Sequence, residues 1–281
     1  MSCPLHHIFL TPGFFGFANL GELLYFSHVA GYLPRACRSV GIEARVHSVH
    51  TYPTSSLRRR AKRLLAAMEL EAAADDAPVH VVGHSSGGLD ARLLLSPGTT
   101  LGRHPDALEA LLRRVESVVT ICSPNHGTPV ASFFTSILGK QLLRVLSLAT
   151  MYALRFGRLP ASALVRLGAV VARADDMVGW RNNVLDQLYS QLLNDFSPAR
   201  RREIESFMGD VGTDQALLPQ LTAEGVDVLN ASTADRPGVR YGSVVSYARR
   251  PGLVSTASVG LDPYGQATHA LFAGLYRLAS A

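Results

Sequence analysis

The chain has 281 residues, of which 47% are hydrophobic and 17% charged, with a formal net charge of +5. A chain of this length can bury a large core without disulfide or metal staples, and its hydrophobic content excludes a disordered protein. Basic residues occur in short, scattered runs without interleaved aromatic side chains, so we expect no nucleic-acid partner. The positive charge is compatible with attraction to an anionic lipid interface.

The cysteines and the apolar runs indicate whether to expect disulfides, a zinc site, a membrane span or a leader. Cys3, Cys37 and Cys122 are far apart and form no CxxC pair, which argues against a disulfide framework and against a zinc site. No uncharged apolar run reaches the length of about 18 residues that a membrane span requires, and no basic leader precedes the first apolar run. We therefore expect no transmembrane segment and a cytoplasmic protein, with secretion as the open alternative.

Apolar, β-branched segments alternate with amphipathic ones along most of the chain. The predicted strands lie at 7–10, 44–49, 78–82, 115–122 and 238–247. The predicted helices lie at 27–40, 55–70, 89–95, 108–114 and 266–278. Such alternation is typical of an α/β protein whose mostly parallel sheet is covered by helices on both faces.

The alternation stops between residues 133 and 208, where apolar residues recur only at helical spacing. This segment is either a small helical subdomain or a mobile lid over a site. We therefore predict an N-terminal part of the core at 1–132, a helical lid or cap insertion at 133–208, and a C-terminal part of the core at 209–281.

A G-x-S-x-G motif, Gly83-His84-Ser85-Ser86-Gly87, joins the third predicted strand to a helix. A sharp strand-to-helix turn forces the central serine into a strained conformation, which neighbours without side chains, Gly83 and Gly87, accommodate. The turn predicts an exposed Ser85 hydroxyl at a helix N-terminus, where the N–H of Ser86 favours developing negative charge. The pattern predicts a nucleophile elbow.

Acyl transfer needs a second oxyanion donor, expected from the loop after an early strand. Residues 11–17, Thr-Pro-Gly-Phe-Phe-Gly-Phe, occupy that place. The N–H of Phe14 is the best candidate donor, and Phe15 and Phe17 either line an apolar acyl pocket or belong to the core. Asn125 and His126, which follow the fourth predicted strand, either border the site or fix a turn.

Three of these segments resemble the bacterial triacylglycerol lipases of the α/β-hydrolase superfamily. The matching motifs are Thr-Pro-Gly-Phe at 11–14, Gly-His-Ser-Ser-Gly-Gly at 83–88 and Ser-Pro-Asn-His-Gly-Thr-Pro at 123–129, with weaker likeness at 217–222 and 239–241. The resemblance implies an α/β-hydrolase fold, Ser85 as the nucleophile, an oxyanion hole from the N–H groups of Phe14 and Ser86, and a lid after residue 131. The chain departs from the family at Pro12, where the family has histidine, and at Pro251, where it has the catalytic aspartate.

The base and the acid are harder to place. In this fold the order along the chain is serine, acid, histidine, so His269 is the in-order base and Asp262 the nearest acid. Seven residues is a short separation for loops that follow two different strands, and His269 lies in a helical pattern. Other candidate acids are Asp210, Asp214, Asp227 and Asp235, and candidate bases that break the order are His84 and His126.

A second explanation is that the chain ends before the final strand and its histidine loop. The family's structural calcium site would then also lie beyond the chain end, and we expect no cofactor and no metal among these residues.

The sequence thus predicts a serine carboxylic ester hydrolase, a lipase or esterase that acts on an ester or lipid substrate through an acyl-enzyme on Ser85. An acyltransferase or thioesterase would carry the same elbow. A catalytically impaired hydrolase-fold module that binds lipid or a partner is the alternative of a different class.

Overall fold

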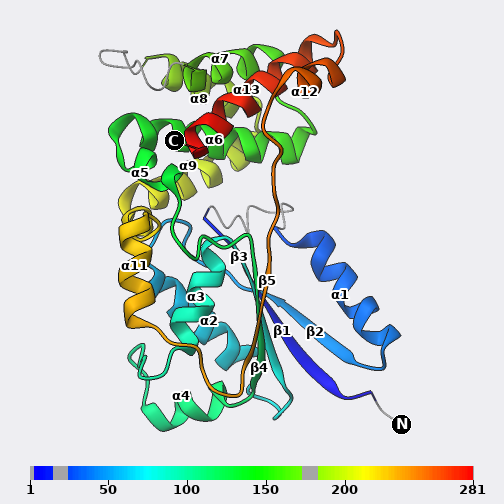
Figure 1. The fold of residues 1–281 in the computed structure, drawn as a ribbon, viewed down its shortest axis with the longest axis vertical. Coiled ribbons are helices and arrows are strands. Elements are labelled where there is room, and N and C mark those ends of the chain that lie inside the picture. The colour runs from blue at the N-terminus through cyan, green and yellow to red at the C-terminus, as the bar shows by residue number, and fades with distance from the viewer. Residues whose placement is uncertain (1–2, 15–24, 173–182, 281) are drawn as a thin grey trace. The chain divides into compact units, whose positions relative to one another are not determined.

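A computed structural model describes residues 3–14, 25–172 and 183–280. It contains one sheet of five parallel strands in the order β2-β1-β3-β4-β5 (Figure 1). The strands are β1 (Leu5–Thr11), β2 (Glu43–Ser48), β3 (Val79–His84), β4 (Val115–Ile121) and β5 (Arg240–Val244).

Helices connect these strands and cover both faces of the sheet. Those beside the sheet are α1 (Ser27–Ser39), α2 (Leu57–Glu71), α3 (Ser86–Leu95), α4 (Pro105–Leu112), α10 (Leu217–Gln220) and α11 (Ala223–Ser232). Figure 1 shows α1 on one face and α2 and α3 on the other.

The alternation of side chains along β1 explains why both faces are covered. Ile8 and Leu10 point to one face and pack with Phe26 and the apolar side of α1. Phe9 points to the other face, where it joins the large cluster formed with α2, α3 and α4. The predicted α/β class, a parallel sheet between two helical layers, is confirmed.

The chain divides into two compact units, one formed by residues 1–127 and 209–246 and the other by 128–208 and 247–281. The second unit contains described helices only: α5 (Pro129–Thr135), α6 (Ile137–Phe156), α7 (Ala161–Ala172), α8 (Asn183–Asn194), α12 (Leu253–Ser258) and α13 (Pro263–Ser280). Helix α9 (Pro198–Thr213) runs from the second unit into the first.

The last segment belongs to a different unit from the one that its sequence predicted. Residues 247–281 group with the helical unit rather than with the sheet, because α13 packs along α7 and also contacts α5. The expected core segment at 209–281 therefore contributes to the sheet unit only as far as residue 246. Among the described helices, none is long and apolar enough to cross a membrane.

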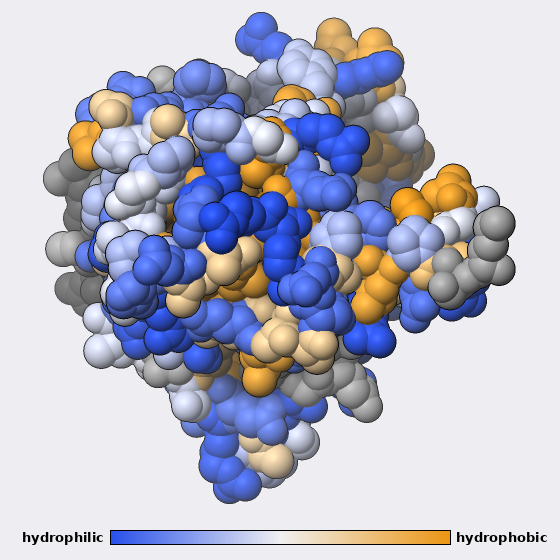
Figure 2. All heavy atoms as spheres, turned by 90° about the horizontal axis from the view of Figure 1, so that it is seen from below, coloured by the Kyte–Doolittle hydropathy of each residue, from blue (hydrophilic) through white to orange (hydrophobic). Residues whose placement is uncertain are grey.

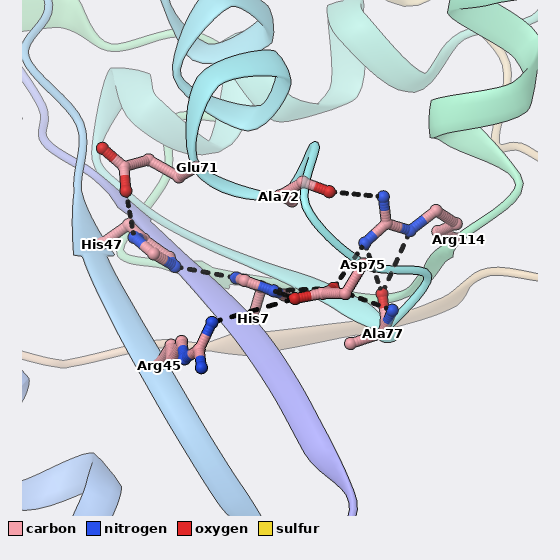
Figure 3. Close-up of polar contacts among 8 residues, drawn as sticks. All are labelled: His7, Arg45, His47, Glu71, Ala72, Asp75, Ala77 and Arg114. Carbon is pink, nitrogen blue, oxygen red and sulfur yellow. Dashed lines mark hydrogen bonds and ion pairs between the residues drawn. The ribbon is translucent and has the colours of Figure 1, made fainter.

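A chain of polar contacts runs from β2 across β1 to the segment between α2 and β3 (Figure 3). His7, fully buried on β1, places Nδ1 2.9 Å from Nε2 of His47 and Nε2 3.1 Å from the carboxylate of Asp75. Glu71 lies 3.4 Å from His47 at one end, and Arg114 lies 3.3 Å from Asp75 at the other.

Figure 2 shows hydrophilic side chains gathered on the face of the molecule seen from below, with hydrophobic ones between them.

Candidate active site

The turn from β3 to α3 has the backbone strain that its glycines predict. Ser85 adopts φ 53° and ψ −128° at the N-cap of α3. Residues other than glycine rarely adopt this backbone conformation. Its N–H donates to the carbonyl of Ile121 at 2.8 Å, and its own carbonyl accepts from the N–H of Gly88 at 3.1 Å. The surrounding backbone thus holds a residue that is unfavourable in isolation.

Two close backbone approaches explain why the flanking positions are glycines. A Cβ on Gly83 would lie 2.5 Å from the backbone carbon of Gly87. A Cβ on Gly87 would lie 2.3 Å from the carbonyl oxygen of Thr11. Because backbone atoms cannot move aside as a flexible side chain can, both positions require glycine.

The loop after β1 lies directly against the Ser85 side chain. A Cβ on Gly13 would lie 2.6 Å from Cβ of Ser85 and 3.1 Å from its Oγ. Phe14, whose N–H is the predicted second oxyanion donor, follows Gly13 and is half-buried. Phe15 and Phe17, the predicted acyl-pocket residues, lie outside the described residues.

The first turn of α3 provides the other predicted donor. Ser86 is fully buried and begins the helix, so its N–H has no intrahelical acceptor. The N-terminus of this ten-residue helix carries partial positive charge. The Ser86 N–H and the positive end of α3 would both stabilise negative charge that develops next to Ser85.

Tyr25 connects the start of α1 to this turn and was not singled out from the sequence. Its hydroxyl lies 2.5 Å from Nδ1 of His84, the residue before Ser85. Burial raises the pKa of the Tyr25 hydroxyl, and a hydrogen bond with the Gly13 backbone partly opposes that rise. Burial also lowers the pKa of His84. Tyr25 therefore contacts both the turn from β3 to α3 and the loop after β1.

A buried ion pair supports the same two segments from within the core. Arg60 of α2 and Asp90 of α3 both have fully buried side chains, and Nη2 of Arg60 lies 2.8 Å from Oδ2 of Asp90. Arg60 also donates from Nη2 to the carbonyl of Pro12 at 2.7 Å and from Nη1 to that of Tyr52 at 2.7 Å. Burial raises the pKa of Asp90 to about 6, and the guanidinium of Arg60 opposes this rise.

The sequence analysis did not predict this pair, although the sequence contains a signal for it. Arg60 lies in the apolar stripe of α2 that includes Leu57, Ala61 and Leu64. Asp90 lies between the apolar residues Leu89 and Ala91. Opposite charges on two apolar helix faces indicate a buried, paired contact.

The turn after β4 is braced by side-chain contacts. Asn125 accepts from Nη1 of Arg92 at 3.3 Å through its side chain and from Nδ2 of Asn230 at 3.0 Å through its carbonyl. His126 is exposed. Both line a cavity of about 310 Å³ together with residues of β4 and β5. Asn125 thus has the turn-fixing contacts that were one of its two expected roles.

The predicted base and acid both lie in the second unit. Nε2 of His269, within α13, is 3.0 Å from Oγ of Ser255. Asp262 accepts from the N–H of Gly265 at 2.8 Å and from that of Tyr264 at 3.3 Å, and so caps the start of α13. Among the described residues of the first unit, the Ser85 hydroxyl has no hydrogen-bond partner. His269 and Asp262 therefore remain predictions.

Comparison with known proteins gives matches in structure only, since no family model and no curated protein matches the sequence. A mature lipase of Bacillus licheniformis aligns with 97% of this chain and 75% of its own, at 13% identity and a TM-score of 0.45. Lipase 1 of Pelosinus fermentans aligns over 85% and 67% at 19% identity and a TM-score of 0.44. A lipase of Staphylococcus hyicus aligns over 85% and 66% at 18% identity and a TM-score of 0.43. The chain spans about two thirds to three quarters of the lengths of these three lipases.

Proposed function

We propose that this protein is a serine carboxylic ester hydrolase of the lipase or esterase type, with Ser85 as the nucleophile. The observation that carries the proposal is the backbone of Ser85, held at φ 53° at the N-cap of α3 with Gly13 packed against its side chain. A strained serine between two glycines, beside a second loop, matches the nucleophile elbow of one class of serine hydrolases.

The proposed reaction has two steps. The Ser85 oxygen attacks the ester carbonyl carbon and gives its proton to a base, and the carbonyl oxygen becomes an oxyanion. The N–H groups of Phe14 and Ser86 are the proposed donors to that oxyanion. The alcohol leaves with a proton, and water then attacks the acyl-serine, which releases the carboxylic acid and restores Ser85.

His269 is the proposed base and Asp262 the proposed acid, on the order of residues in the chain alone. Replacement of His269 with alanine should abolish turnover if His269 takes the Ser85 proton. Unchanged turnover in that variant would remove both assignments and leave the nucleophile untouched.

The segment 133–208 is the proposed lid. A lid that opens at a lipid surface predicts that the rate rises abruptly when the ester concentration passes its solubility limit. A smooth saturation curve across that limit would argue for a helical subdomain without a gating role.

The nucleophile is tested by turnover of p-nitrophenyl esters of several chain lengths and by labelling with a fluorophosphonate probe. We expect Ser85→Ala to lose the label and to lower the rate by at least about 10³-fold. Ser39→Ala, which changes an exposed serine at the end of α1, is the matched control and should keep both.

The same measurements separate the alternatives. Faster turnover of thioester substrates than of oxygen esters would assign a thioesterase on the same serine. Faster acyl transfer to added alcohols than to water would assign an acyltransferase. A folded wild-type protein that takes no label would refute the hydrolase and favour the module that binds lipid or a partner.

A further inference from the structure

A second group of side chains with metal-binding chemistry lies at the amino ends of the central strands, apart from Ser85. It consists of His6 on β1, His80 on β3 and Glu116 on β4. One nitrogen or oxygen of each lies within 4.8 Å of the other two. Nδ1 of His6 and Nε2 of His80 are 2.9 Å apart, and the two rings are stacked at an angle of 17°.

We propose that His6, His80 and Glu116 form a binding site for a divalent transition-metal ion, with Zn²⁺ as the best match. Two imidazole nitrogens and one carboxylate oxygen are a donor set that Zn²⁺ takes in proteins, with a water as the fourth ligand. Bonds of about 2.0–2.1 Å in a tetrahedral site place neighbouring ligand atoms about 3.3 Å apart. The two histidine nitrogens are within a few tenths of an ångström of that separation.

Sheet register brings the two histidines together. His80 pairs with Ile8 on β1, two residues beyond His6, so both imidazoles extend from the same face of the sheet. Both side chains are half-buried rather than enclosed, which leaves a path for an ion. Since neither residue is cysteine, the sparse cysteines that argued against a zinc site do not bear on this one.

A supporting contact orients His80. Its Nδ1 lies 2.7 Å from Oγ of Ser117. When Nδ1 donates to this oxygen, the lone pair of Nε2 is directed toward His6 and is available to a metal. A hydrogen bond of this kind on the distal nitrogen is usual for histidine ligands.

The third ligand, the carboxylate of Glu116, is weakly held. Glu116 is exposed, and its present partner is Arg240, 3.5 Å away and more exposed still. An ion pair between two exposed side chains contributes little, so a bound cation can compete for the carboxylate.

The test uses the full chain freed of metal by EDTA and then dialysed, with Zn²⁺ as the probe. We expect one Zn²⁺ per chain by elemental analysis after gel filtration, and a rise in melting temperature of about 5 °C once Zn²⁺ exceeds its dissociation constant about 100-fold. Substitution with Co²⁺ should give the intense visible bands of a four-coordinate ion. His28→Ala, which removes an exposed histidine of α1, is the control and should bind as wild type does.

His80→Ala and Glu116→Gln should each weaken Zn²⁺ binding at least tenfold by calorimetric titration. If His80→Ala does not fold, Glu116→Gln decides the matter alone, because that side chain is exposed and its replacement is isosteric. The proposal is overturned if wild type retains no ion and shows no thermal shift, or if Zn²⁺ binds the Glu116→Gln variant as tightly as wild type. Turnover of p-nitrophenyl esters tests Ser85 separately, so either proposal can fail without the other.

Discussion

Gly13, which has no side chain, lies directly against Ser85. The loop that carries Gly13 and Phe14 can approach the serine only because no Cβ lies between them. Arg60 bonds the carbonyl of Pro12, and Tyr25 contacts the Gly13 backbone, so the loop is held from two sides. A small displacement here would alter the geometry on which the proposed chemistry depends.

Gly13→Ala tests this fit. The new Cβ would lie 2.6 Å from Cβ of Ser85, so the loop or the serine must shift. We expect kcat/KM for p-nitrophenyl esters to fall at least about tenfold and the free energy of unfolding to fall by about 1–3 kcal/mol. Steady-state kinetics and urea unfolding measure the two effects.

Gly31→Ala in α1 is the matched control, because nothing lies within 4 Å of the added Cβ. It should leave kcat/KM unchanged and raise the free energy of unfolding by about 0.5–1 kcal/mol, as alanine does in a helix. Undiminished activity in Gly13→Ala would show that the loop plays no part in the reaction.

At the scale of elements, the ion pair between Arg60 and Asp90 joins α2 to α3 and joins both to the loop after β1. Ion pairs in a core are costly to form, since both charges leave water. This one satisfies its polar atoms almost fully, because the guanidinium donates to three backbone carbonyls, those of Tyr52, Pro53 and Pro12, in addition to Asp90. The pair therefore ties α3 to the loop after β1.

Arg60→Leu should lower the free energy of unfolding by about 3–5 kcal/mol at about pH 8.5, since it leaves Asp90 buried without a partner. Without the guanidinium the pKa of Asp90 rises beyond about 6, so the folded variant binds a proton that folded wild type does not. The deficit relative to wild type should therefore shrink as the pH is lowered from about 8.5 toward about 6.

Urea unfolding at several pH values measures this change. Arg58→Leu, two positions earlier and exposed on the same helix, is the control and should change stability little between about pH 8.5 and about 6. A deficit that does not vary with pH would contradict the burial of an ionisable Asp90.

At the scale of the whole molecule, the polar chain of Figure 3 links β1 and β2 to the end of α2 and to the start of β4. Burial, with the positive potential of His7, lowers the pKa of His47, and Glu71 opposes this only in part. The pKa of Asp75 is lowered by the backbone N–H of Ala77 and by His7. Both shifts make the folded state bind fewer protons than the unfolded chain.

The sign of the pH dependence follows from these shifts. His47 protonates in the unfolded chain at about pH 6.5 but only at lower pH in the folded one, so stability falls as the pH drops below about 6.5. Asp75 adds a further loss below about pH 4, as the pH falls through its lowered pKa.

His47→Gln should flatten the first of these losses. We expect the free energy of unfolding to fall less steeply between about pH 7.5 and pH 5.5. The slope against pH should decrease by up to the amount that one bound proton contributes. Urea titrations at each pH measure it, with the exposed His28→Gln as control. A slope equal to that of wild type would show that His47 is not the group responsible.

The features that could be predicted from the sequence are those that depend on residues close together in the chain. The strand positions, the helical segment after residue 133 and the parallel α/β class all follow from periodicity and from β-branched runs, and the turn at Ser85 follows from its glycines. Tyr25, Arg60 and Asp90 escaped because their contacts join residues 30 to 60 positions apart, which no local pattern encodes.

The amino-acid sequence by itself determined the sheet, its class and the strained serine, because each depends on residues within one element or one turn. Only the tertiary structure decided the rest: that Gly13 lies against Ser85, that residues 247–281 pack with the helical unit, and that His6, His80 and Glu116 converge. The physical reason is that strand order and register set which distant side chains meet, and these are properties of the assembled sheet.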